Sequence, residues 1–201
     1  MTTAITTPNS SRRTLLLLAA LFILPFVIGS GLFWLDWRPE KFGNHGELLQ
    51  PPRVLPAVGL YHADGRPLPT AELLGKWLLV LPVKGSCNAT CQNNLQGMLK
   101  VHIALNKEQN RMQRVLIVGD VSDSANDPPM VELQRLFPGL LVAAVQANVA
   151  AEAWHGALNG RGQDVFIVDP IGNVMMRYAD PSDMRGVLKD LERLLKYSWI
   201  R

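Results

Sequence analysis

Hydrophobic and polar positions divide the chain into an apolar N-terminal run and a longer mixed part. From Leu15 to Leu35 no residue is charged, and as a helix this run is long enough to cross the ~30 Å hydrocarbon core of a bilayer. Arg12 and Arg13 precede it and no acidic residue lies upstream of its end, so the positive-inside rule places the N-terminus in the cytoplasm. The pattern predicts a cytoplasmic tail at residues 1–13 and a transmembrane helix at 14–35.

The same segment has a second interpretation, as an export signal. Ser11-Arg12-Arg13 before a leucine run resembles a twin-arginine signal. The apolar run is long for a signal peptide, and no Ala-x-Ala-like cleavage site follows it, which favours an uncleaved anchor. We therefore expect a single-pass protein of a bacterial inner membrane, with its C-terminal domain in the periplasm.

Residues 36–56 differ in composition from what precedes and follows them. Pro39, Pro51, Pro52 and Pro56 argue against a helix. The segment is expected to be an extended periplasmic tether that packs along the domain or the membrane surface, with a solvated His45, and to lead into a folded domain at 57–201.

Beyond the tether, strand-like and helix-like patterns alternate. Continuous apolar runs predict buried strands, and 3.6-residue spacing predicts helices. The expected strands are 77–83, 115–118, 141–145, 165–168 and 174–178, the last two joined by a hairpin at 169–173. The expected helices are 92–109, 131–137, 150–158 and a final helix starting at 180–181. Apolar strands covered by helices in this order predict an α/β fold of the thioredoxin-like type.

Charge excludes one class of partner. The chain has 20 basic and 17 acidic residues, and two of the arginines precede the anchor. The outer domain is therefore nearly balanced and offers no basic surface for nucleic acid.

The two cysteines, Cys87 and Cys91, lie between a predicted strand and a predicted helix. Thiols one helical turn apart can form a disulfide or bind a soft metal such as Cu(I). A disulfide closing so short a loop gains little from chain entropy. The position at a helix N-terminus, where thiolates are stabilised, favours reactive cysteines over a purely structural bond.

With its single anchor, the strand that follows Gly75-Lys76 into Cys87-x-x-x-Cys91, and the Asp169-Pro170-x-Gly172 hairpin, the chain resembles the Sco/SenC group of thioredoxin-fold proteins. The resemblance covers roughly residues 60–197. It implies a role in cytochrome c oxidase assembly through copper handling. The implied partners are the membrane and an oxidase subunit or another assembly factor.

The chain also departs from that family pattern. Sco proteins have a proline after each motif cysteine, where this chain has Asn88 and Gln92. Their third copper ligand is a histidine, and the matching position here is Arg161, which cannot bind Cu(I). His155 is the nearest substitute, either as a third ligand or as a surface histidine.

Three functions remain open from the sequence. The favoured one is non-catalytic assistance in cytochrome c oxidase biogenesis, with Cys87 and Cys91 as a redox pair or as copper ligands together with His155. The second is an enzyme, a periplasmic thiol-disulfide oxidoreductase. This alternative is weakened because the stretch before Val165 has no proline for the cis-proline loop of such enzymes. The third is an assembly scaffold in which the cysteines form a structural disulfide.

Overall fold

The computed structural model describes residues 9–35, 43–57, 59–85, 87–119, 130–145, 149–159, 163–179 and 184–198. The chain forms two compact units, Met1–Gly43 and Asn44–Arg201.

The N-terminal unit contains one long helix, α1 (Asn9–Trp34), with Pro25 inside it. Within α1, Arg12–Trp34 contains an 18-residue window with a mean hydropathy of 2.5, and the length and composition of this stretch suit a membrane span. This confirms the predicted apolar helix. Whether it serves as an anchor or as a signal sequence stays a prediction.

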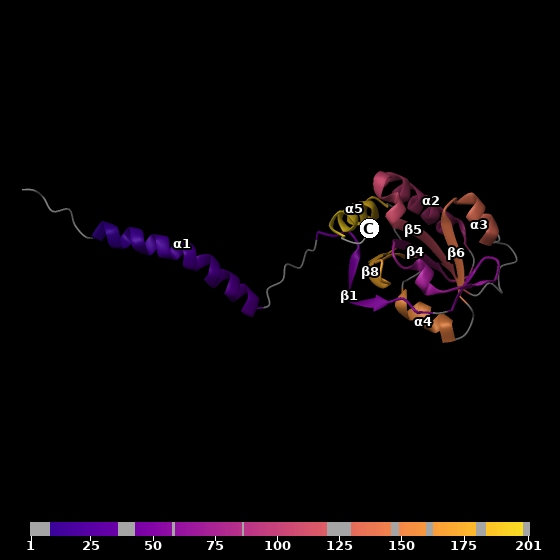
Figure 1. Ribbon diagram of the computed structural model, residues 1–201, viewed down its shortest axis with the longest axis horizontal. Coiled ribbons are helices and arrows are strands. Elements are labelled where there is room, and N and C mark those ends of the chain that lie inside the picture. Colours follow the sequence, from indigo (N-terminus) through magenta and orange to yellow (C-terminus); the bar gives the residue numbers. More distant parts are fainter. Residues whose placement is uncertain are drawn as a thin grey trace, which may run out of the picture. The chain divides into compact units, whose positions relative to one another are not determined.

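The second unit is built on one eight-stranded mixed sheet in the order β1-β8-β7-β4-β5-β6-β2-β3 (Figure 1). The central strands β4, β5 and β6 are parallel, and β7 and β8 form an antiparallel hairpin beside β4. The strands are β1 (Glu47–Val54), β2 (Leu60–His62), β3 (Pro67–Leu68), β4 (Trp77–Val83), β5 (Met112–Val118), β6 (Leu140–Val145), β7 (Val165–Val168) and β8 (Asn173–Tyr178).

Helices cover both faces of this sheet, as the continuous apolar runs predicted. In Figure 1, α2, α3 and α5 lie on one side and α4 on the other. On β4, Leu79 and Leu81 face the α2 and α5 side, whereas Leu78 and Val80 pack with Trp154 of α4. The helices are η1 (Thr70–Leu73), α2 (Ala89–Ala104), η2 (Asn106–Arg111), α3 (Met130–Leu136), α4 (Val149–Ala157) and α5 (Arg185–Tyr197). The thioredoxin-like α/β fold predicted from the sequence is confirmed.

Helix α2 differs at both ends from the sequence prediction. α2 begins three residues earlier than expected, because the Asn88 side chain caps it. α2 also ends earlier than expected, at Ala104. Asn106 follows two residues later with a φ of 48°, which lies outside the α-helical region. The expected start of the last helix, Asp180-Pro181, lies outside the described residues.

The hairpin between β7 and β8 confirms the predicted turn. Asp169 Oδ1 accepts hydrogen bonds from the amides of Ile171, at 3.1 Å, and Asn173, at 2.7 Å. Gly172 has a φ of 95°, which favours glycine.

The segment expected to be an extended tether packs along the domain, one of the two arrangements predicted for it, but it does so as a strand of the sheet. From Asn44 onward it belongs to the folded unit, and β1 pairs with β8 at the edge of the sheet. The register shifts between Leu48 and Arg53, the stretch that contains Pro51 and Pro52. An edge strand tolerates prolines because one side of its backbone has no neighbouring strand to bond. The prolines exclude a helix, as inferred, but they are compatible with this strand.

A disulfide at the start of helix α2

The sheet and α2 together place the two cysteines. β4 ends at Val83, the chain turns through Gly85 with a φ of 76°, and α2 begins at Ala89. Asn88 has extended backbone angles, and its Oδ1 accepts the Cys91 amide at 3.0 Å. This is a helix N-cap, which satisfies one of the amides that lack a partner within the helix.

Cys87 and Cys91 form a disulfide with their Cα atoms 5.2 Å apart. Cys87 is 3% exposed and Cys91 is 0% exposed, and both pack in the core between the sheet and α2. When reduced, they lie where the positive end of the helix dipole favours thiolate. Cys91 is fully enclosed, whereas Cys87 keeps a small exposed fraction.

A chain of amide groups joins the start of α2 to Gln163, two residues before β7. The buried Asn94 side chain donates to the Gln163 carbonyl at 3.3 Å. The Gln163 side chain donates through Nε2 to Asn88 Oδ1 at 2.7 Å, the same oxygen that caps α2. This contact could not be predicted from local sequence, since Asn88 and Gln163 are 75 positions apart.

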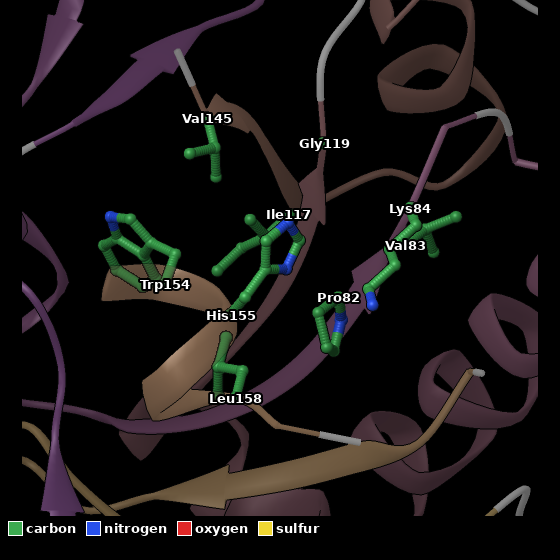
Figure 2. A pocket seen from close by; sticks show the side chains of 9 residues that line it. All are labelled: Pro82, Val83, Lys84, Ile117, Gly119, Val145, Trp154, His155 and Leu158. Carbon is green, nitrogen blue, oxygen red and sulfur yellow. The ribbon is translucent and has the colours of Figure 1, made fainter. Parts of the chain in front are cut away.

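His155 lies elsewhere. It is exposed on α4 and lines a pocket at the carboxyl ends of β4 and β5, with Pro82, Lys84 and Ile117 among its neighbours (Figure 2). The buried residues of α4 pack on the sheet face opposite to that of the disulfide. Arg161 is outside the described residues. A role for His155 as a metal ligand stays a prediction.

The copper that the family resemblance implies requires a set of soft or imidazole donors close together. In the described ranges, no three His, Cys, Asp or Glu side chains are grouped so as to hold a metal ion. The cysteine sulfurs are bonded to each other, and a disulfide sulfur is a poor ligand because metals bind the thiolate. The described residues therefore do not fit a three-ligand copper site.

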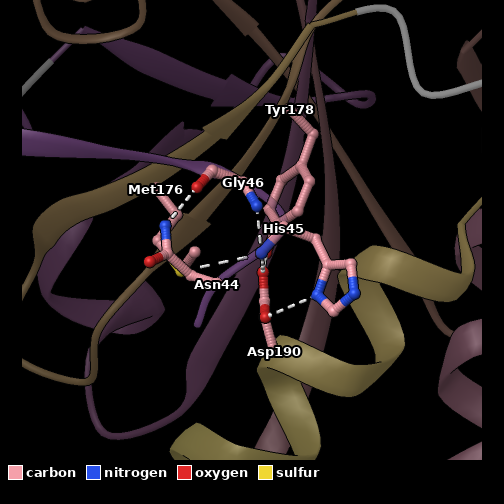
Figure 3. A network of polar contacts seen from close by, with 6 residues as sticks. All are labelled: Asn44, His45, Gly46, Met176, Tyr178 and Asp190. Carbon is pink, nitrogen blue, oxygen red and sulfur yellow. Dashed lines mark hydrogen bonds and ion pairs between the residues drawn. The ribbon is translucent and has the colours of Figure 1, made fainter. Parts of the chain in front are cut away.

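A second polar cluster joins the segment before β1 to α5 (Figure 3). Asp190 Oδ2 accepts the amides of His45, at 2.7 Å, and Gly46, at 3.0 Å, and the Tyr178 hydroxyl at 2.7 Å. Asp190 Oδ1 lies 3.2 Å from His45 Nδ1. We call His45, Gly46, Tyr178 and Asp190 the Asp190 cluster. His45 is exposed, as expected of a solvated residue, but its amide and ring also contact Asp190 of the domain.

The cluster perturbs two pKa values. Burial alone would raise the pKa of Asp190, but hydrogen bonds from Gly46, Tyr178 and His45 outweigh it and lower that pKa. Burial, followed by the interaction with Asp190, raises the pKa of Tyr178. Asp190 is consequently a charged acceptor at neutral pH, and Tyr178 is a neutral donor.

Two glycines allow the close packing in this cluster. A Cβ on Gly46 would lie 2.6 Å from the Tyr178 ring, and one on Gly186 would lie 2.8 Å from the His45 Cβ. The sequence does not indicate these contacts, because Gly46 is distant in the chain from Tyr178, and Gly186 from His45.

Comparison with solved structures identifies proteins of similar fold. The crystal structure of Arabidopsis thaliana ScoI with copper bound has 13% identity and a TM-score of 0.59, covering 72% of this chain and 99% of the other. Yeast Sco1 has 17% identity and a TM-score of 0.60, covering 74% and 97%. BsSco, described as a Sco-family cytochrome c oxidase assembly protein with a disulfide switch, has 13% identity and a TM-score of 0.57, covering 76% and 98%. At such identities the similarity establishes a shared fold.

Sequence comparison gives a more direct assignment. No curated protein matches the chain significantly. A family model described as the transmembrane-like, thioredoxin-like, C-terminal domain matches residues 77–198, from the first residue of β4 to the residue after α5. The chain therefore belongs to the transmembrane-like, thioredoxin-like, C-terminal domain family.

Proposed function

We propose that this protein is a membrane-anchored factor of cytochrome c oxidase biogenesis, in which Cys87 and Cys91 alternate between dithiol and disulfide. The observation that carries the proposal is the disulfide at the N-terminus of α2, on a fold shared with Sco proteins. BsSco, which has this fold, is described both as an oxidase assembly protein and as the carrier of a disulfide switch.

The exchange can be written with this chain's own atoms. The Cys87 thiolate attacks one sulfur of a partner's disulfide, and the other partner sulfur leaves as a thiolate that takes up a proton. Cys91 then loses its proton, displaces the partner's bound sulfur and closes the Cys87–Cys91 bond. Two electrons pass to the partner, and a donor protein of the dithiol class restores the reduced pair.

Burial favours a dedicated partner over general oxidoreductase activity. Cys87 is only 3% exposed, so an incoming sulfur must approach along a narrow path. Exchange rates depend on access as well as on thiolate character. A partner with a complementary surface meets this requirement better than unfolded substrates of many kinds.

Complementation of a deletion strain tests the proposal. Wild type should restore cytochrome c oxidase activity to the membranes, while Cys87→Ser and Cys91→Ser should not. Cys91→Ser should also accumulate a mixed disulfide between Cys87 and its partner, because the resolving thiol is missing. Thr90→Ala, at an exposed position in the same helical turn, is the matched control. Full complementation by both serine variants would contradict the proposal.

The proposed location follows from α1. We place residues 14–35 across the inner membrane, the tail 1–13 in the cytoplasm and the C-terminal domain in the periplasm. A periplasm-dependent reporter fused after Arg201 should be active in the membrane fraction. Activity in a soluble product shortened by the length of the apolar segment would show that α1 is a cleaved signal.

Copper handling is a second candidate, supported by the Arabidopsis structure with copper bound and by the convergence of two cysteine sulfurs. Once reduced, these two thiolates are soft ligands of the kind that select Cu(I). His155 is proposed as an additional ligand only in this candidate. Titration of the reduced protein with Cu(I) separates the two candidates.

A further inference from the structure

We infer that Asn88 and Gln163 are positioning residues that set the redox equilibrium of the Cys87–Cys91 pair, an inference that rests on the proposed redox function. The geometry points to this role because one oxygen, Asn88 Oδ1, receives both the Cys91 amide and the Gln163 side chain. One residue of the reacting pair is thus connected directly to the segment before β7.

The contacts form a closed path that begins and ends on α2. The side chain of Asn94, in the second turn of the helix, donates to the Gln163 carbonyl. The Gln163 side chain donates to Asn88 Oδ1, and the same Asn88 oxygen accepts the amide of Cys91. Gln163 Oε1 is buried and has no hydrogen-bond partner among the described residues. The bond to Asn88 is therefore the polar contact that orients this side chain. Asn88 is exposed, so the Gln163 bond also restricts a side chain that would otherwise sample several rotamers.

This path affects the disulfide more than a simple cap would, for two reasons. Holding the first turn of α2 in the dithiol form keeps Cys91 near Cys87 and raises the effective concentration of one thiol at the other. Asn88 also accepts the hydrogen bond of the Cys91 amide, so that this amide is not available to stabilise a Cys87 thiolate. Both effects favour the disulfide, so loss of the path should make the disulfide easier to reduce.

The test is the thiol–disulfide equilibrium of the full-length protein in detergent, measured in glutathione buffers. In this reaction the protein disulfide and two glutathione thiols give the protein dithiol and glutathione disulfide. Asn88→Ala and Gln163→Met should each shift the equilibrium toward the dithiol by roughly threefold to tenfold, the range expected when a helix cap is lost. The double variant should shift it little further, since both changes break one path.

A pH profile separates positioning from plain structural support. The alkylation profile of Cys87 should move to lower pH in Asn88→Ala, because the freed amide becomes available to its thiolate. The serine of Asn88→Ser can still cap α2, but its side chain is too short to accept the Gln163 hydrogen bond. This variant should therefore show the same equilibrium shift as Gln163→Met. Gln92→Ala, in the same turn and outside the path, should leave both readouts unchanged.

Equilibria within twofold of wild type in Asn88→Ala and Gln163→Met would overturn the inference, whether or not melting temperatures fall. These measurements use the purified protein and a small thiol. The proposed oxidase role could therefore fail in the deletion strain while this inference holds, or the reverse.

Discussion

Replacement of Asp190 tests whether the segment before β1 is an integral part of the domain. Asp190 is 4% exposed, and its Oδ2 accepts three hydrogen bonds, from the His45 amide, the Gly46 amide and the Tyr178 hydroxyl. Asp190→Asn keeps the size of the side chain and can keep an acceptor at this position. It removes the negative charge that strengthens these bonds.

The expected loss follows from the number of bonds. A hydrogen bond to a charged group contributes about 1.5–3 kcal/mol, against about 0.5–1.5 kcal/mol for a neutral one. For three bonds sharing one oxygen, which are not additive, we expect Asp190→Asn to lower the free energy of unfolding by about 2–3 kcal/mol. This corresponds to a fall of roughly 5–10 °C in melting temperature for a unit of this size. Asp190→Ala should cost more, about 4–5 kcal/mol, because it leaves the donors without an acceptor and removes packed atoms.

Two measurements check this expectation on the full-length protein in detergent. Thermal melts give the stability, and hydrogen exchange of the His45 and Gly46 amides reports whether the segment detaches. Glu192→Gln, an exposed carboxylate on the same helix, is the control and should melt within a degree or so of wild type, as surface substitutions usually do. An Asp190→Asn variant that melts like the control, with unchanged exchange of both amides, would refute the reasoning.

The same carboxylate predicts a pH dependence. The folded state lowers the pKa of Asp190, so its contribution to stability is fully present above the unfolded-state pKa of about 3.9 and is lost as pH falls through the lower folded-state value. The difference in melting temperature between wild type and Asp190→Asn should therefore shrink as pH falls below about 4. A difference that stays constant down to pH 2 would mean that the charge of Asp190 is not the cause.

Three further expectations concern the disulfide and the domain boundary. The reduced protein should remain folded, with a melting temperature within a few degrees of the oxidised form, because a disulfide between residues four apart closes a very short loop; a reduced form that unfolds at ambient temperature would instead indicate a structural disulfide. Reduced wild type should bind Cu(I) more tightly than Cys87→Ser or Cys91→Ser if copper is handled, and His155→Ala should reduce that affinity less. Equal copper retention by wild type and the double serine variant would remove the copper candidate. A fragment of residues 44–201 should fold and remain soluble, whereas 57–201 should aggregate, since it lacks β1 and two donors to Asp190; equal melting temperatures for the two fragments would contradict this.

The interior of the sheet could be predicted from the sequence because its strands need no distant information. β4 and β6 are continuous apolar runs and β5 is one from Val115 onward, since helices cover both faces. The strands at the edges carry weaker signals. β1 has mostly exposed or half-buried residues and two prolines, so nothing local distinguishes it from a tether. Its pairing depends on β8, which lies more than a hundred residues further along the chain.

The candidate site shows the same division between local and distant information. The four-residue spacing of Cys87 and Cys91, just before a helical pattern, was sufficient to predict their proximity. Gln163 was not identified, because a glutamine before a strand carries no signature and its contact with Asn88 arises only when β7 lies beside β4. Asp190 was not identified either, because the sequence does not distinguish it from the other charged residues of an amphipathic helix.

The two departures from the Sco pattern, at Asn88 and Gln92, have one structural consequence in common. A proline at position 88 would have no side-chain acceptor for the Cys91 amide and no oxygen for Gln163. A proline at position 92 would remove the amide that donates to the Asn88 carbonyl at 3.0 Å, the first hydrogen bond of α2. This chain therefore has a more tightly bonded first turn around its cysteines than a sequence with proline at both positions could form. A rigid turn favours closure of a disulfide, whereas a metal ion requires two thiolates that can separate and adjust to it. The same two residues that weaken the match to a copper-binding pattern thus strengthen the case for a redox pair.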